Sequence, residues 1–208
     1  MATVSNLPEF EFNFDGSYKS SKRKAGAGAV LWVTMPGSST KEMVWTCSES
    51  LGKRTNNEAE YRGFIMCLEA ARRFEIPKII VKGDSKLVVN QFNGSYKVKA
   101  AHLVPLWTQA MEIAADLVSI EVLHIDREYN SVADKLSNDG DCNITTSSFT
   151  VGWNADRILG LIASSPVAIE DRTHHQVDAV ETTVENEVDQ DEVVGAIATS
   201  NAVLPVAH

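Results

Sequence analysis

The chain has 208 residues, of which 44% are hydrophobic and 23% are charged, as is typical of a soluble globular protein with one domain of ordinary size and a tail. The formal net charge of −9 comes from residues 141–208, with 2 basic and 11 acidic residues (2 − 11 = −9), because residues 1–140 carry 17 of each (17 − 17 = 0). The acidic average therefore excludes no ligand class for the folded part, whereas the lack of any run near the ~20 apolar residues that span a bilayer excludes a membrane helix.

Three strands are predicted first, joined by polar turns. Residues 9–15 alternate strictly, with three phenylalanines on one face and Asp15 on the other, and the Gly-Ser pair that follows ends the strand. Residues 25–34 and 42–48 are the next two strands. We expect these three strands to form an antiparallel meander.

Helices and strands then alternate along the chain. A capped helix begins at Thr55 and ends before Pro77. The later elements are a strand over 78–83, helices over 85–92 and 103–117, a strand over 118–125 and a helix over 131–138. This order predicts an α/β fold with a five-stranded mixed sheet flanked by helices.

The domain organisation follows from where this periodicity stops. We expect an N-terminal extension over 1–8, one domain over 9–140 and an acidic, largely disordered tail over 141–208. Residues 153–162 could form one more short element, but no core periodicity extends past residue 150.

Cysteine usage and the N-terminus indicate the compartment. Cys47, Cys67 and Cys142 are odd in number, and no pair has the spacing of a metal finger. The first eight residues lack the apolar run of a secretory signal. We therefore expect free thiols and an intracellular protein, in the nucleus or the cytoplasm, with no membrane partner.

Four acidic residues stand at the ends of predicted elements. Asp15 and Asp84 end strands, Glu60 lies on the packed side of the long helix, and Asp134 lies near the start of the last helix. Each one alone could be a solvated surface acid or an acid that favours a helix dipole. As a set they would repel one another unless a cation neutralised them, and Mg²⁺ is the natural occupant of an all-oxygen site.

Five motifs in succession carry a family resemblance. They are FDGSYK, GAGAV, TNNEAEYRGFIMCLEAA, VKGDSKLVVNQFNG with YKVK, and H-x-x-RE-x-N-x-x-AD-x-LSN. In this order and at these separations they resemble the ribonuclease H type 1 family, most of all its reverse transcriptase-like branch from retroelements, plants and microbes. The resemblance covers about residues 9–140 and implies a ribonuclease H-like fold.

The resemblance also implies an activity and a ligand set. The Asp of FDGS is Asp15, the second acid of NNEAE is Glu60, the Asp of GDS is Asp84 and the Asp of AD-x-L is Asp134. In the family these four residues bind two Mg²⁺ ions about 4 Å apart, for which Mn²⁺ can substitute. The implied reaction cuts the RNA strand of an RNA–DNA hybrid and leaves a 3′-hydroxyl and a 5′-phosphate.

Two residues before the last acid have open roles. The family has a histidine there that shuttles protons or helps to release product. His124 either has this role or is a buried strand histidine. Arg127 either reaches a substrate phosphate or pairs with Glu128 on the surface.

The predicted substrate contacts surround the acids. Asn56 and Asn57 can hydrogen-bond in the groove of the hybrid, although Asn56 could equally be a helix cap. Gly16 and Ser17 would allow close approach of the RNA backbone. Further candidate phosphate contacts, each of which could instead be a solvated charge, are Lys22, Arg23 and Lys24.

Two other functions are weighed against the monomeric hybrid nuclease. The chain could be a domesticated retroelement fragment that binds nucleic acid with weak or no cleavage. It could also be a nuclease of the same superfamily that acts on double-stranded RNA. The tail has no predicted partner.

Overall fold

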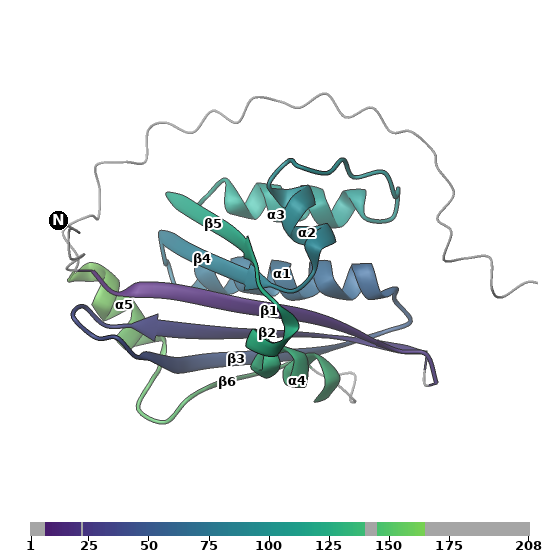
Figure 1. Cartoon of the computed structure of the whole chain (residues 1–208). Coiled ribbons are helices and arrows are strands. Elements are labelled where there is room, and N and C mark those ends of the chain that lie inside the picture. Colours follow the sequence, from purple (N-terminus) through teal and green to yellow (C-terminus); the bar gives the residue numbers. More distant parts are fainter. Residues whose placement is uncertain (1–6, 22, 140–144, 165–208) are drawn as a thin grey trace, which may run out of the picture.

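The protein is described by a computed structural model that covers residues 7–21, 23–139 and 145–164. It has one mixed sheet in the strand order β5-β4-β1-β2-β3-β6 (Figure 1). The strands are β1 (Glu9–Lys19), β2 (Lys24–Thr34), β3 (Lys41–Gly52), β4 (Lys78–Gly83), β5 (Ser119–His124) and β6 (Thr146–Phe149). The helices are α1 (Asn56–Arg73), α2 (Lys86–Phe92), α3 (Val104–Ala114), α4 (Ser131–Asp139) and α5 (Ala155–Ala163), with a 3₁₀ turn over Arg127–Tyr129.

The sheet differs from the expected one in two places. It has six strands rather than five, because β6 pairs antiparallel with β3 from Trp45 opposite Phe149 to Ser48 opposite Thr146. The first strand also does not end at the Gly-Ser pair. It pairs with β2 along its whole length, from Glu9 opposite Thr34 to Lys19 opposite Lys24, and this ladder carries the strand through the glycine.

Helices cover both faces of the sheet. The long helix α1 begins with a capping box, in which the Thr55 side chain accepts the Glu58 N–H and the Glu58 carboxylate accepts the Thr55 N–H. It packs on the phenylalanine face of β1, and α4 lies on the opposite face (Figure 1). A Cβ atom on Gly28 of β2 would lie 2.5 Å from the Ala133 carbonyl oxygen, so the absent side chain lets α4 rest directly on the sheet.

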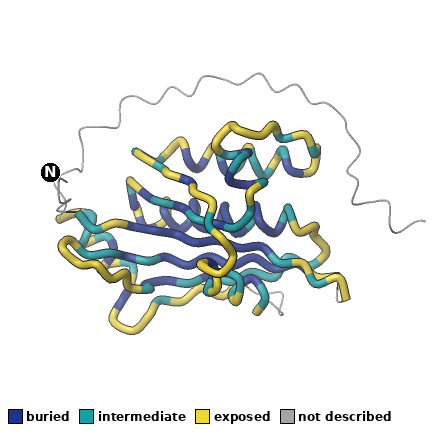
Figure 2. The backbone as a smooth tube through the Cα atoms, in the orientation of Figure 1, coloured by how far each residue is buried: buried dark blue, intermediate teal, exposed yellow. Residues whose placement is uncertain are grey.

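The hydrophobic core lies between the sheet and α1. Phe12, Phe14 and Phe64 are fully buried, and Figure 2 shows buried positions following β1, β2 and α1 through the centre of the molecule. Cys47 and Cys67 are buried free thiols, as expected, while Cys142 lies outside the described residues. Among the described helices, none is long and apolar enough to cross a membrane.

The core extends past residue 150, contrary to expectation. Trp153 and Ile158 are buried in it, and the Phe149 ring lies 5.5 Å from the ring of Phe74 at the end of α1. The segment over β6 and α5 therefore adds an edge strand to the sheet and two buried residues to the core. Residues 165–208, for which disorder is predicted, lie outside the described part of the chain.

Candidate active site

Two of the four acids meet because their strands are parallel neighbours. Strand β1 pairs with β4 in parallel, with Phe14 opposite Gly83, so Asp15 and Asp84 come to the same edge one residue later. Asp15 is only 3% exposed, and Asp84 is half-buried just beyond its strand. Carboxyl ends of adjacent parallel strands are a common place for ligands to bind.

The third acid reaches this edge from α1. The backbone N–H of Gly16 donates to Glu60 Oε2 at 3.0 Å, which fixes the carboxylate beside Asp15. A Cβ atom on Gly16 would lie 2.1 Å from the Glu60 backbone nitrogen, so α1 can approach β1 this closely only at a glycine. Carboxylate oxygens of Asp15, Glu60 and Asp84 lie within 4.8 Å of one another.

Two of the three carboxylates, Asp15 and Glu60, have raised pKa values. Burial, followed by the charges of neighbouring Asp15 and Asp84, raises the pKa of Glu60 from 4.5 to about 9. Burial is also the main cause that raises the pKa of Asp15 from 3.8 to about 7, with contributions from Asp84 and Asp134 and an opposing hydrogen bond from Ser137. Both groups therefore hold a proton to higher pH than a solvated carboxyl group would.

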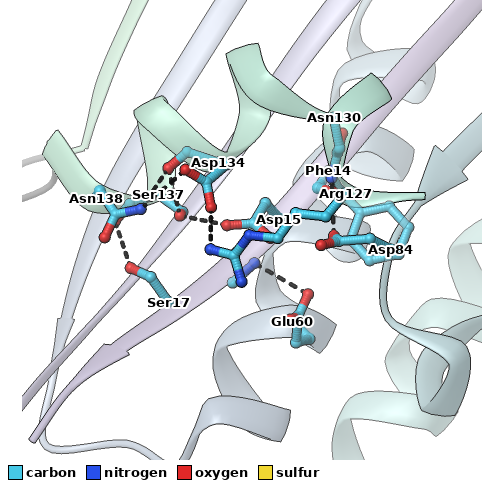
Figure 3. A network of polar contacts seen from close by, with 11 residues as sticks. Phe14, Asp15, Ser17, Glu60, Asp84, Arg127, Asn130, Asp134, Ser137 and Asn138 are labelled. Atoms are coloured by element: carbon cyan, nitrogen blue, oxygen red, sulfur yellow. Dashed lines mark hydrogen bonds and ion pairs between the residues drawn. The ribbon is translucent and has the colours of Figure 1, made fainter. Parts of the chain in front are cut away.

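The fourth acid lies beside the cluster and has partners of its own. Asp134 stands in the first turn of α4, where the Arg127 guanidinium pairs with its Oδ1 atom and Asn138 Nδ2 lies 3.4 Å from Oδ2 (Figure 3). It is not within the group of three, although its charge contributes to the raised pKa of Asp15.

Two positioning residues were missed by the sequence interpretation. Asn130 is 1% exposed, and its Nδ2 donates both to the Phe14 carbonyl oxygen at 2.7 Å and to Asp84 Oδ1 at 2.9 Å. Ser137, one turn after Asp134, donates its hydroxyl to Asp15 (Figure 3). Both are fixed letters of the last motif, H-x-x-RE-x-N-x-x-AD-x-LSN, so the signal was present in the sequence.

A comparison with known protein families identifies the family of this chain. The family described as reverse transcriptase-like matches residues 13–140, from the middle of β1 to the end of α4. The chain belongs to the reverse transcriptase-like family. The elements β6 and α5 lie outside the matched segment.

Relatives of this reverse transcriptase-like chain include one that is named a ribonuclease H. A bifunctional protein of Mycobacterium tuberculosis is 37% identical over 125 residues, which are 60% of this chain and 33% of that protein. Ribonuclease HI of Halobacterium salinarum is 33% identical over 126 residues, 61% of each chain. The match thus spans one third of the mycobacterial relative and less than two thirds of the archaeal one.

Solved structures confirm the ribonuclease H-like α/β fold. The crystal structure of RNase H1 from Halobacterium salinarum superposes with a TM-score of 0.58 at 30% identity, covering 64% of this chain and 96% of that one. The N-terminal RNase H domain of the mycobacterial protein gives 0.56 at 34% identity, covering 64% and 92%. LC11-RNase H1, solved in complex with an RNA/DNA hybrid, gives 0.55 at 29% identity, covering 63% and 95%.

The remaining predicted residues of this reverse transcriptase-like chain fall around the acids. His124 ends β5 opposite Gly83 and is exposed, so the alternative of a buried histidine is wrong. Arg127 pairs with Asp134, not with Glu128. Thr55, not Asn56, is the helix cap, and Asn56 is exposed at the start of α1 with half-buried Asn57 beside it.

A basic groove of about 280 Å³ adjoins the start of α1. Its walls are Tyr18 and Arg23 from the β1–β2 hairpin, together with Lys53, Arg54, Thr55 and Glu58. Lys24 begins β2 beside this hairpin, while Lys22 lies outside the described residues. Ser17 Oγ donates to the Ser137 carbonyl oxygen at 2.8 Å, so this hydroxyl ties β1 to α4.

Proposed function

We propose that this chain is an endoribonuclease that hydrolyses the RNA strand of RNA–DNA hybrids. The observation that carries the proposal is the meeting of Asp15, Glu60 and Asp84, from three different elements, with carboxylate oxygens within 4.8 Å. The names and structures of the ribonuclease H relatives support it.

The residues fit a divalent metal ion. The cluster offers only hard oxygen donors, which suit Mg²⁺ or Mn²⁺. Burial, and then the neighbouring carboxylates, raise the pKa values of Asp15 and Glu60, so a bound cation would stabilise the charged forms of both. Asn130 Oδ1 is buried beside Asp84 and accepts no hydrogen bond from the described residues. We therefore propose two Mg²⁺ ions, with Mn²⁺ as a substitute, held by Asp15, Glu60, Asp84 and Asp134.

The chain's own groups would prepare the site. When bound, the ions would activate a water for attack on phosphorus and stabilise the leaving 3′ oxygen, which gives 3′-hydroxyl and 5′-phosphate products. The Gly16 N–H orients Glu60 and Asn130 orients Asp84, so these ligands are held before substrate arrives. His124 is exposed at the end of β5, and its role in product release stays a prediction.

The hybrid would lie along the rim between the acids and the basic groove. Arg23 and Lys53 supply positive charge for phosphates, and binding should weaken as salt rises. Asn56, Asn57, Gly16, Ser17, Lys22, Lys24 and Arg127 stay predicted substrate contacts. Recognition of RNA would rest on its 2′-hydroxyls.

Cleavage assays with an Asp15→Asn variant test the proposal. The wild type should cut the RNA strand of a labelled hybrid with Mg²⁺ or Mn²⁺ and leave ends that a ligase requiring 5′-phosphate accepts. The variant should bind the hybrid but lose cleavage by about 10³-fold or more, because a ligand carboxylate is gone. Near-normal turnover of the variant would refute the metal assignment.

The same assay distinguishes the alternatives. Tight binding of the hybrid without cleavage by the wild type would favour the domesticated nucleic-acid-binding module. Equal cleavage of double-stranded RNA would favour the duplex nuclease. Duplex DNA is the negative control for every arm.

A further inference from the structure

The fourth carboxylate is already neutralised by the chain. Arg127 Nη2 forms a close ion pair with Asp134 Oδ1, and Asn138 Nδ2 lies near the other oxygen. The Arg127 side chain is 74% exposed and that of Asp134 is 29% exposed. Within the described part of the chain, Asp134 therefore has an ion-pair partner, whereas Asp15, Glu60 and Asp84 have none.

The same guanidinium acts on the other three acids. Figure 3 shows the Arg127 side chain extending from the turn after β5 across the carboxylates toward Asp134. Its charge opposes the rise in the pKa of Glu60, and the charges of Asp15 and Asp84 contribute to the raised pKa of Arg127 itself. The Arg127 guanidinium thus lies between Asp134 and the group of three (Figure 3).

We propose that Arg127 is a built-in cation of the metal site, which holds Asp134 until a second divalent ion binds there and displaces the guanidinium. This inference rests on the proposed function, because it takes Asp134 to be a ligand of the second ion. Asp15, Glu60 and Asp84 would bind the first ion without breaking an ion pair within the described part of the chain.

The two binding steps should therefore differ. Binding of the second ion must break the Arg127–Asp134 pair, whereas binding of the first ion breaks no ion pair. An exposed pair of this kind is worth up to about 1 kcal/mol, which corresponds to about fivefold in affinity. Arg127 is a positioning residue here, since it acts through Asp134.

Displacement would also free the arginine. Arg127 sits in a 3₁₀ turn of three residues whose members are all exposed, so its side chain has room to swing outward. A released guanidinium is a good bidentate partner for a phosphate. Binding of the second ion and contact with the substrate backbone would then be coupled.

Measurements of Mn²⁺ binding test the role of Arg127 without relying on catalytic activity. Free Mn²⁺ is followed by electron paramagnetic resonance, and the heat of binding is measured by calorimetry. The full-length wild type is compared with Arg127→Ala and with Arg127→Gln, which retains some polarity. Lys135→Ala is the matched control, because Lys135 is an exposed cation next to Asp134 on the same helix. Circular dichroism checks that each variant is folded.

We expect both Arg127 variants to bind the second Mn²⁺ about fivefold more tightly, with a smaller gain in the first step, where the guanidinium acts through its charge alone. Lys135→Ala should change the affinity for the second Mn²⁺ by less than about twofold, because it removes an exposed charge that acts only at long range through solvent. In a background of Asp134→Asn the gain from Arg127→Ala should vanish.

Two results overturn the inference in distinguishable ways. Equal second-step affinity in the wild type, the Arg127 variants and the Lys135 control would overturn the role of Arg127 alone. A wild type that binds no Mn²⁺ at millimolar concentration would overturn the proposed metal site, and this inference with it.

Discussion

Glu60 should destabilise the fold whenever no divalent ion is present. Its pKa rises from 4.5 to about 9 on folding, chiefly because it is buried. Between these two pH values the unfolded chain releases a proton that the folded chain keeps, so the stability of the wild type should fall as pH rises through this window. Glu60→Gln removes the titration and leaves a side chain of the same shape that still accepts the Gly16 N–H.

The size of the effect follows from the same pKa values. At about pH 7.5 the retention of this proton by folded Glu60 lowers the free energy of unfolding by up to about 4 kcal/mol, which is about 1.36 kcal/mol for each pH unit above 4.5. Part of this penalty is shared with Asp15, so we expect Glu60→Gln to stabilise the protein by about 2–4 kcal/mol. For a domain of this size the Tm should rise by about 6–12 °C.

The Tm difference between Glu60→Gln and the wild type is measured by circular dichroism at several pH values, in buffer that contains a metal chelator. The gain should disappear near pH 4, where Glu60 is protonated in both states. Mg²⁺ should raise the Tm of the wild type more than that of the variant. Glu112→Gln, on an exposed position of α3, is the control and should change little. A lower Tm for Glu60→Gln in the chelator at about pH 7.5 would refute the reasoning.

Two further predictions concern packing. Gly16→Ala should destabilise the fold by about 3 kcal/mol or more, because the new Cβ would lie 2.1 Å from the Glu60 backbone nitrogen. The control is Gly160→Ala in α5, where a Cβ would have nothing within 4 Å. Equal stabilities of the two variants in urea unfolding would contradict this prediction. A chain truncated after Ser164 should unfold at the same urea concentration as the full chain. A chain truncated after Asp139 should be less stable by about 3 kcal/mol or more, because it lacks the buried Trp153 and Ile158. Equal urea midpoints for the two truncated chains would show that α5 does not stabilise the fold.

Local patterns predicted the elements well where burial is periodic. The alternating phenylalanines predicted β1, and the helical stripe and cap at Thr55 predicted α1. Strand β6 has the sequence TSSF, with three exposed residues, so its only signal is pairing with β3, which no local pattern contains. The end of β1 was misplaced for the same reason, since β2 lies elsewhere in the sequence.

The site was predictable in its residues more than in its contacts. The motifs identified Asp15, Glu60 and Asp84, which the structure brings together. The pair between Arg127 and Asp134 was not predicted, because it depends on the turn between β5 and α4. Asn130 was not assigned a role, because its partners lie 116 and 46 residues away in the sequence.

Two glycines of β2, Gly26 and Gly28, determine how closely α4 packs on the sheet. Cβ atoms on Gly26 and Gly28 would lie 2.2 Å from the Ser137 carbonyl oxygen and 2.5 Å from that of Ala133, so main chain rests on main chain there. Asp134 is carried on this helix, and its separation from the other acids is therefore a spacing between two backbones. Rotation of the Asp134 side chain can change the direction of its carboxylate. The distance between the Asp134 backbone and the other acids is fixed by the close packing of α4 on the sheet.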